Sequence, residues 1–371
     1  MTQNTSEALD TLLNPAWLGA ACNRPVQAIK LRIKPDTSIL CALQNLDSGI
    51  VDGWARILWP DGLTKAKKTE QWANQHGLRV TTTILPSDLV FQYGEIAADP
   101  KLHPYLQPEF LGFELGDLQH ILRYNPSRRL VYRHKDTIVR ISEKQDELGY
   151  ELHQFLSTII QTPARLDHGE NRRLSISQVV GDSDLSQMPN FRATRQAGRI
   201  LAKLHAETSS ISTGLSAKLA KRSTNFESQI KAHEHIFQSL APDLAGKIRT
   251  IAAHIPRHIP GAPVLLHGDA SPDQFLVSKD NSQLWLTDFD RARLGPAAYD
   301  LGSYLSVVDS SSGQALMEGY ADIYGALPPP MDLRAAQLQS LLMRIAEPLR
   351  SGNPNWRSIT SAALAEVERL L

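Results

Sequence analysis

The chain has 371 residues, with 39 Lys plus Arg balanced by 39 Asp plus Glu, and 42% of its residues are apolar. This length predicts two or three structural units, and the neutral total excludes a general nucleic-acid binder. The apolar content excludes an intrinsically disordered chain, and no apolar run is long enough to predict a membrane helix. The two cysteines, Cys22 and Cys41, favour a cytoplasmic protein with reduced thiols over a disulfide-bonded secreted one.

The first part of the chain, residues 1–115, predicts a mixed α/β unit. Strand-like stretches lie within 29–43 and over 53–59, and Pro-Asp turn signals interrupt or follow them. Residues 64–77 are polar and compatible with a helix that ends at Gly77.

A meander of three short strands is predicted next, over 122–124, 129–133 and 137–141. The following segment, 143–160, carries apolar residues with helical spacing and predicts an amphipathic helix. Strand character returns over 174–180.

The rest of the chain predicts mainly helices. Apolar residues recur with the i, i+3, i+4, i+7 spacing around 197–204 and 338–345, and a similar stripe lies in the last helix. These stripes are interpreted as core-facing surfaces rather than as binding sites. His205 and Trp356 are likewise interpreted as packing residues.

The segment 263–305 carries the residues that indicate chemistry. A short apolar strand leads into His267-Gly268-Asp269, and Gln274 follows five residues after the aspartate. A second apolar strand, 284–287, ends in Asp288-Phe289-Asp290. Two strands joined by a short turn therefore each border acidic residues, and this hairpin can bring them around one point.

Those residue types suit phosphoryl transfer. A hard cation prefers carboxylate and amide oxygens, which Asp288 and Gln274 offer, and the absence of His and Cys ligands there disfavours zinc. An attacking hydroxyl needs a carboxylate that can take its proton, and Asp269 is free for that task. Asp290 is either a second metal ligand or a solvated side chain.

The ordered set of these motifs resembles the catalytic core of the aminoglycoside phosphotransferase and choline kinase-like family. The resemblance runs from Gly116 to the C-terminus and implies an α+β, bilobal protein-kinase-like fold. It divides the chain into an N-terminal α/β cap unit over 1–115, an N-lobe with hinge over 116–182 and a helical C-lobe over 183–371. The first unit resembles the N-terminal cap of maltokinase-like members.

By this resemblance Asp269 is the catalytic base and His267 braces its loop, while Gln274 and Asp288, with Asp290 as an additional candidate, hold Mg²⁺. Asp300, which on its own reads as a helix N-cap, braces the loop from the next helix. Gln274 stands where the family has Asn.

In the N-lobe the resemblance places the ATP-binding residues. Arg140 stands where the family has the phosphate-binding Lys, and its helix partner is expected to be Glu151, with Glu147 as second choice. The phosphate-covering turn contains Ser127 and Arg128; Arg128 and Arg129 also read as a solvated strand edge. Gln178 and Val180 lie in the hinge that holds adenine.

The sequence thus predicts an ATP- and Mg²⁺-dependent small-molecule kinase whose acceptor is a hydroxylated compound, with a sugar, amino sugar or aminoglycoside-like molecule as the first choice. No nucleic-acid or membrane partner is expected, and the oligomeric state is left open. The replacements at Gln274 and Arg140 keep a second hypothesis open, a nucleotide-binding regulatory module without turnover. A protein kinase is disfavoured, since Gly-rich, His-Arg-Asp and Ala-Pro-Glu signatures are missing.

Overall fold

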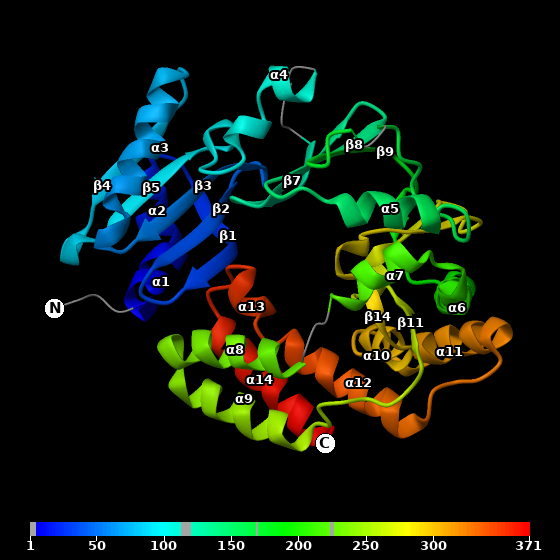
Figure 1. Cartoon of the computed structure of the whole chain (residues 1–371). Coiled ribbons are helices and arrows are strands. Elements are labelled where there is room, and N and C mark those ends of the chain that lie inside the picture. Colours follow the sequence, from blue (N-terminus) through cyan, green and yellow to red (C-terminus); the bar gives the residue numbers. More distant parts are fainter. Residues whose placement is uncertain (1–4, 113–119, 168–169, 223–225) are drawn as a thin grey trace.

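The N-terminal part of the chain is built on a five-stranded antiparallel sheet with the strand order β1-β2-β3-β5-β4 (Figure 1). The computed structural model describes residues 5–112, 120–167, 170–222 and 226–371. The strands are β1 (Val26–Lys34), β2 (Ser38–Asn45), β3 (Val51–Leu58), β4 (Val80–Ile84) and β5 (Val90–Glu95). The helices of this unit are α1 (Thr5–Leu13), α2 (Pro15–Cys22) and α3 (Leu63–Gln75), with the short α4 (Pro108–Leu111) after the sheet.

A second, four-stranded antiparallel sheet follows, with its strands in sequence order. It contains β6 (Ile121–Asn125), β7 (Arg129–His134), β8 (Thr137–Ser142) and β9 (Leu174–Gln178), and α5 (Glu147–Leu156) lies between β8 and β9 in the chain. Helix α5 begins after Asp146 because the carboxylate of that residue accepts a hydrogen bond from the Gly149 N–H at 2.9 Å. It is therefore shorter than the 143–160 helix predicted from the apolar spacing.

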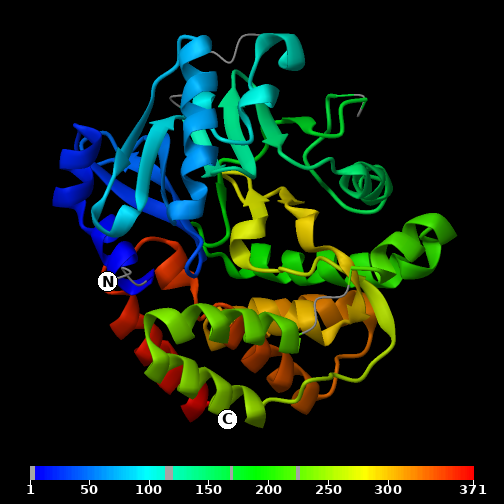
Figure 2. The same cartoon turned by 60° about the vertical axis from the view of Figure 1, so that its left-hand side comes forward.

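The rest of the chain is mainly helical, with three short strands in one sheet and two in another. The helices are α6 (Phe191–Ala206), α7 (Thr213–Ala220), α8 (Phe226–Leu240), α9 (Pro242–His254), α10 (Ala298–Leu305), α11 (Ser310–Tyr324), α12 (Pro330–Met343), α13 (Glu347–Arg350) and α14 (Trp356–Arg369). The short strands are β10 (Ser183–Asp184), β12 (Phe275–Val277) and β13 (Leu284–Leu286) in one sheet, and β11 (Pro263–Leu266) and β14 (Arg293–Pro296) in the other. Figure 2 shows the β12–β13 hairpin, in yellow, between the second sheet and the helices.

Helices α6 and α11 approach each other unusually closely because glycine lies at their crossing. A Cβ atom on Gly198 would lie 2.0 Å from the Leu316 carbonyl oxygen, and one on Gly319 would lie 1.8 Å from the Arg195 carbonyl oxygen. No side chain fits at either position, so these two glycines permit backbone contact between the helices. Both helices contribute side chains to the apolar core that also contains the hairpin residues Phe275 and Leu286.

The N-terminal sheet is covered on both faces, which β2 illustrates. Its side chains alternate, so that Ile39, Cys41 and Leu43 join one apolar core while Leu40 and Ala42 join another. The first core also contains residues of α8, α9, α12, α13 and α14, and the second also contains residues of β6, β7 and β8. The N-terminal unit thus packs against both the second sheet and the helical part.

The described elements agree with the main features that were predicted. The strands within 29–43 and at 53–59, the helix near 64–77 and the three-stranded meander are all present. The predicted boundary at residues 115 and 116 lies outside the described residues, and the division into three units stays a prediction. None of the helices in the described part of the chain has the length and apolar character needed to cross a membrane.

Candidate active site

The loop between β11 and β12 is held in place by one buried carboxylate, that of Asp300 on α10. Asp300 is fully buried and accepts hydrogen bonds from the backbone N–H groups of His267, at 2.7 Å, and Gly268, at 2.8 Å. Gly268 has a φ of +83°, and a Cβ there would lie 2.1 Å from the Arg291 carbonyl oxygen. The His267-Gly268-Asp269 turn therefore needs glycine at its centre.

Asp300 is ionised and paired inside the protein. His205 on α6 donates from Nε2 to Asp300 at 3.1 Å, and its Nδ1 lies 2.9 Å from the Tyr320 hydroxyl. Burial alone would raise the pKa of Asp300, but the hydrogen bonds from His205 and Gly268 hold it below the usual range. His205 thus supports the loop through Asp300 and has no direct contact with Asp269 among the described residues.

His267 joins the loop to the strand that precedes the acidic pair. Its ring is fully buried, and Nε2 lies 2.8 Å from the Thr287 carbonyl oxygen, to which it donates because a carbonyl only accepts. Nδ1 is then the acceptor for the Asp269 N–H at 3.3 Å. This single side chain fixes the distance between Asp269 and the residues that follow Thr287.

Asp269 is partly exposed and lies among cations. Its Oδ1 is 3.3 Å from Nη1 of Arg291 and 3.5 Å from Nη2 of Arg344, the residue that ends α12. Arg344 lies far from Asp269 in the sequence and carries no motif that would have indicated this contact. Two guanidinium groups from separate elements therefore contact the carboxylate of Asp269.

Three arginines from the second sheet meet the Asp-Phe-Asp acids across the cleft. Arg123 on β6 contacts Asp288 at 3.2 Å, Arg140 on β8 contacts Asp290 at 2.6 Å, and Arg129 on β7 also forms an ion pair with Asp290. Burial alone would raise the pKa of Asp290, but Arg140 and Arg129 hold it below its usual range. These ion pairs connect the small sheet to the hairpin.

The oxygen atoms around Gln274 and Asp288 suit a hard cation. The Gln274 amide donates its Nε2 hydrogen to Asp273 at 2.8 Å, which leaves the amide oxygen as an acceptor. Asp288 Oδ1 is buried and has no hydrogen-bond partner among the described residues, although Nη1 of Arg129 lies 3.9 Å from it. The Thr287 N–H donates a hydrogen bond to the Gln274 carbonyl oxygen at 3.0 Å. Since Asp288 follows Thr287, the side chains of Gln274 and Asp288 leave the backbone at neighbouring positions. An amide oxygen and an unsatisfied carboxylate oxygen are the ligands that Mg²⁺ prefers.

A cavity of about 370 Å³ lies between the second sheet and the hairpin. It is lined by Arg140, Gln274, Asp288 and Asp290, together with Ser175 and Ser177 of β9. The predicted hinge residues Gln178 and Val180 are not among its lining residues. The Gln178 N–H instead donates to the Ala164 carbonyl oxygen at 2.8 Å, which ties the end of β9 to the preceding loop.

The predicted pair of Arg140 and Glu151 is not formed. Glu151 forms an ion pair with Lys218 of α7 instead, and Arg140 pairs with Asp290. Gly149 and His153 of α5 line the cavity together with Asp146, which caps the helix, so Glu151 lies on a different face of the helix. The alternative partner Glu147 also makes no ion pair with Arg140.

The turn that carries Ser127 and Arg128 is anchored by the N-terminal unit. Asp99 is fully buried, and its Oδ2 accepts from the Ser127 N–H at 2.8 Å and from the Tyr124 hydroxyl at 2.6 Å. Ser127 has a φ of +58°, a left-handed conformation that this hydrogen bond helps to hold. Ser127 and Arg128 line a second cavity rather than the first.

Comparison with known proteins agrees with this geometry. A family model described as the phosphotransferase enzyme family matches residues 150–334, which include both the loop and the hairpin. The segment 150–334 belongs to the phosphotransferase enzyme family. The chain is therefore a small-molecule kinase, and the family recognised from the motifs is confirmed. No curated protein matches the chain.

One solved structure shows the same fold, and a second is reported for comparison. The GDP complex of aminoglycoside 2′-phosphotransferase-IIIa is 18% identical, with a TM-score of 0.50, and the match covers 72% of this chain and 98% of that one. A choline/ethanolamine kinase family protein from Mesorhizobium loti is 17% identical, with a TM-score of 0.48 and coverage of 72% and 91%. The predicted α+β, kinase-like fold with an additional N-terminal unit is confirmed. The likeness of that unit to maltokinase caps stays a prediction.

Proposed function

We propose that this chain is an ATP- and Mg²⁺-dependent phosphotransferase that moves the γ-phosphoryl group to a hydroxyl of a small molecule. One observation carries the proposal. A partly exposed carboxylate, Asp269, sits on a loop braced by buried Asp300, and His267 links that loop to the strand end that carries Asp288. Phosphoryl transfer depends on such positioning of a base beside phosphate-binding groups.

In this mechanism Asp269 accepts the proton of the attacking hydroxyl while that oxygen bonds to the γ-phosphorus. The bond between the γ-phosphorus and the β,γ-bridging oxygen breaks in the same transfer, and ADP leaves with the electron pair of that bond. Arg291 and Arg344 contact the Asp269 carboxylate and position it for this step. Arg140 and Arg129 exchange part of their pairing with Asp290 for the phosphate oxygens, and Arg clamps phosphate bidentately.

Gln274 and Asp288 would hold Mg²⁺ through the amide oxygen and through carboxylate Oδ1, which accepts no hydrogen bond from the described residues. When bound, the ion supplies neutralisation of the phosphate charge. Asp290, which is engaged by Arg140 and Arg129, is assigned to the phosphate-binding cluster, with metal binding as a secondary role. The two cysteines are free and buried, the state expected for the cytoplasmic location that we include in the proposal.

The test is a coupled ADP-release assay over a panel of neutral, cationic and anionic hydroxyl compounds. The variant Asp269→Asn should bind nucleotide normally and lose about 10²- to 10⁴-fold in transfer rate, since it removes the base. Asp280→Asn, which changes an exposed acid in the β12–β13 turn, is the matched control and should transfer normally. Near-normal turnover by Asp269→Asn would remove Asp269 from the base role.

A second candidate function is nucleotide binding without turnover. The pairing of Arg140 with Asp290 favours it, because this ion pair occupies both groups that the transfer needs. Nucleotide binding with no acceptor-stimulated ADP release across the panel would support this candidate.

A further inference from the structure

A second cavity, of about 590 Å³, adjoins the candidate active site and extends to the N-terminal sheet. Of the fifteen described residues that line it, eight are Lys or Arg and three are Asp or Glu. Arg129, Arg140 and Asp290 line both cavities, so the two spaces meet at the arginines that contact the acidic pair. Arg32 and Lys34 of β1 line only the second.

Four of these cations are unpaired. Of the eight, Lys101 pairs with Glu143, and Arg129 and Arg140 pair with Asp290. Arg222 donates a hydrogen bond to the Asp290 backbone carbonyl oxygen at 3.0 Å. The remaining four cations form no ion pair within the described part of the chain; they are Arg32, Lys34, Arg128 and Lys144. These four groups come from two separate sheets and the segment after β8, and they surround one space.

The charges are also crowded. Burial lowers the pKa of Arg32, the charge of Arg128 lowers it further, and Asp99 and Glu143 offset this only in part. Burial also lowers the pKa of Arg350 on α13; its ion-pair partner Glu347 opposes this shift, whereas Arg291 and Arg128 add to it. Positive charge therefore extends from β1 through Arg128 and Arg350 to Arg291, which contacts Asp269. Like charges held together in this way destabilise the protein unless an anion occupies the site.

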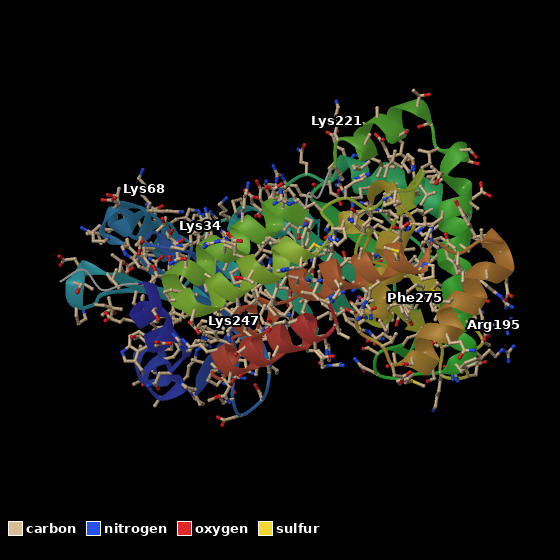
Figure 3. All side chains as sticks on the ribbon, turned by 90° about the horizontal axis from the view of Figure 1, so that it is seen from below. Lys34, Lys68, Arg195, Lys221, Lys247 and Phe275 are labelled. Atoms are coloured by element: carbon tan, nitrogen blue, oxygen red, sulfur yellow. The ribbon has the colours of Figure 1, made fainter. Side chains whose placement is uncertain are left out.

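Nucleotide phosphates account for only part of this charge. The first cavity already offers Arg123, Arg129 and Arg140 beside Asp288 and Asp290. Arg32 and Lys34 belong to the N-terminal unit and reach the space from its far side. Figure 3 labels Lys34 on that unit and Lys221, the neighbour of Arg222, at the end of α7. A neutral or cationic acceptor would leave these cations without a partner.

We infer that the acceptor is an anionic hydroxyl compound, one that carries a phosphate or a carboxylate group, and that Arg32, Lys34 and Arg128 bind this group while its hydroxyl lies at Asp269. The inference rests on the proposed phosphotransferase function. It gives the N-terminal unit a role in acceptor recognition. It also disfavours simple amino sugars and aminoglycosides as acceptors, because this surface repels their positive charge.

The test compares glucose, glucosamine, glucose 6-phosphate and gluconate as acceptors at saturating ATP and Mg²⁺. The anionic compounds should have kcat/KM values at least about tenfold above those of glucose and glucosamine, because charge-assisted hydrogen bonds are strong. Glucose 6-phosphate and gluconate separate phosphate recognition from carboxylate recognition. Equal or faster transfer to the neutral or cationic sugars would overturn the inference and leave the phosphotransferase function intact.

The double variant Arg32→Gln/Lys34→Gln removes two cations of the cavity without touching the catalytic loop. It should reduce kcat/KM for the preferred anionic acceptor by about tenfold or more and leave the KM for ATP unchanged. Lys67→Gln/Lys68→Gln is the matched control, because it removes the same charge from the exposed surface of α3, where Figure 3 labels Lys68. A raised KM for ATP in the first variant would assign the cavity to nucleotide and overturn the inference.

A binding measurement decides the matter independently of turnover. Glucose 6-phosphate, gluconate and glucose are titrated calorimetrically into protein saturated with Mg²⁺ and a non-hydrolysable ATP analogue, so that the nucleotide site is filled. An anionic probe should bind more tightly than glucose, and the Arg32→Gln/Lys34→Gln variant should lose this preference. Failure of every acceptor to stimulate ADP release would refute the proposed function, whereas absence of an anion preference here would refute the inference.

Discussion

The substitution Asp300→Asn tests whether one buried carboxylate holds the candidate catalytic loop. Asp300 accepts three hydrogen bonds, from the backbone N–H groups of His267 and Gly268 and from Nε2 of His205. Asparagine keeps the shape but replaces one oxygen with an NH₂ group, which then faces a donor. At least one buried donor loses its acceptor, at about 1–3 kcal/mol, and the other bonds lose their charge assistance. We expect the free energy of unfolding to fall by about 3–5 kcal/mol.

The effect should depend on pH in a defined direction. The pKa of Asp300 is lowered in the folded protein. Its stabilising contribution is therefore complete above the unfolded pKa of about 3.9 and is lost as the pH falls through the lower folded value. The difference between the wild-type protein and the variant should stay constant from about pH 5 to pH 8 and decrease only below about pH 4.

Urea unfolding followed by tryptophan fluorescence measures the stability, and the ADP-release assay measures transfer. A loop displaced by about 1 Å should cost about 100-fold in rate. Asp47→Asn, which changes an exposed acid in the turn after β2, should alter neither quantity. A loss below about 1 kcal/mol together with a normal transfer rate would show that Asp300 does not position the loop.

Two further substitutions test the turn at Ser127 and the outer face of α5. Asp99→Asn should raise the KM for the anionic acceptor about tenfold and leave the KM for ATP unchanged, because Asp99 holds the Ser127 N–H, next to Arg128, in a charge-assisted hydrogen bond. Tyr124→Phe, which removes only the other partner of Oδ2, should change the KM for the acceptor much less, and equal values in all three proteins would contradict this role. Glu151→Gln should leave the KM for ATP unchanged. It should cost at most about 1 kcal/mol of stability, since it breaks only a partly exposed ion pair with Lys218. A large rise in the KM for ATP would restore Glu151 as the partner of Arg140.

The local motifs were predictable because they depend on short-range sequence. The spacing of Asp269, Gln274 and Asp288 and the two apolar strands beside them identify the hairpin without any knowledge of packing. The strand β4, in contrast, was not predicted, because its sequence Val-Thr-Thr-Thr-Ile carries only weak alternation and its strand form depends on pairing with β5. Helix α2 was also missed, although Asn14 caps it and proline occupies its first position.

The parts of the site that sequence reasoning missed are long-range pairs. Arg344 reaches Asp269 from the end of α12, and Asp99 reaches Ser127 from the N-terminal unit. Glu151 was assigned to Arg140 from the family pattern, but the face of α5 that points into the cavity decides the pairing, and that face carries Asp146 and His153. Side-chain direction on a helix is set by tertiary packing, which a single sequence does not reveal.

The neutral net charge conceals an internal separation that the proposed reaction uses. Residues 120–144 hold seven Lys or Arg against two acids, whereas residues 267–300 hold six acids against three basic residues. The two segments meet in the ion pairs of Arg123, Arg129 and Arg140 with Asp288 and Asp290. On the proposed function, phosphates take over the arginines while the cation takes over the acids, so each charged group exchanges one partner of opposite sign for another. Binding then avoids leaving a charge unpaired in the cleft, an outcome that would be costly there.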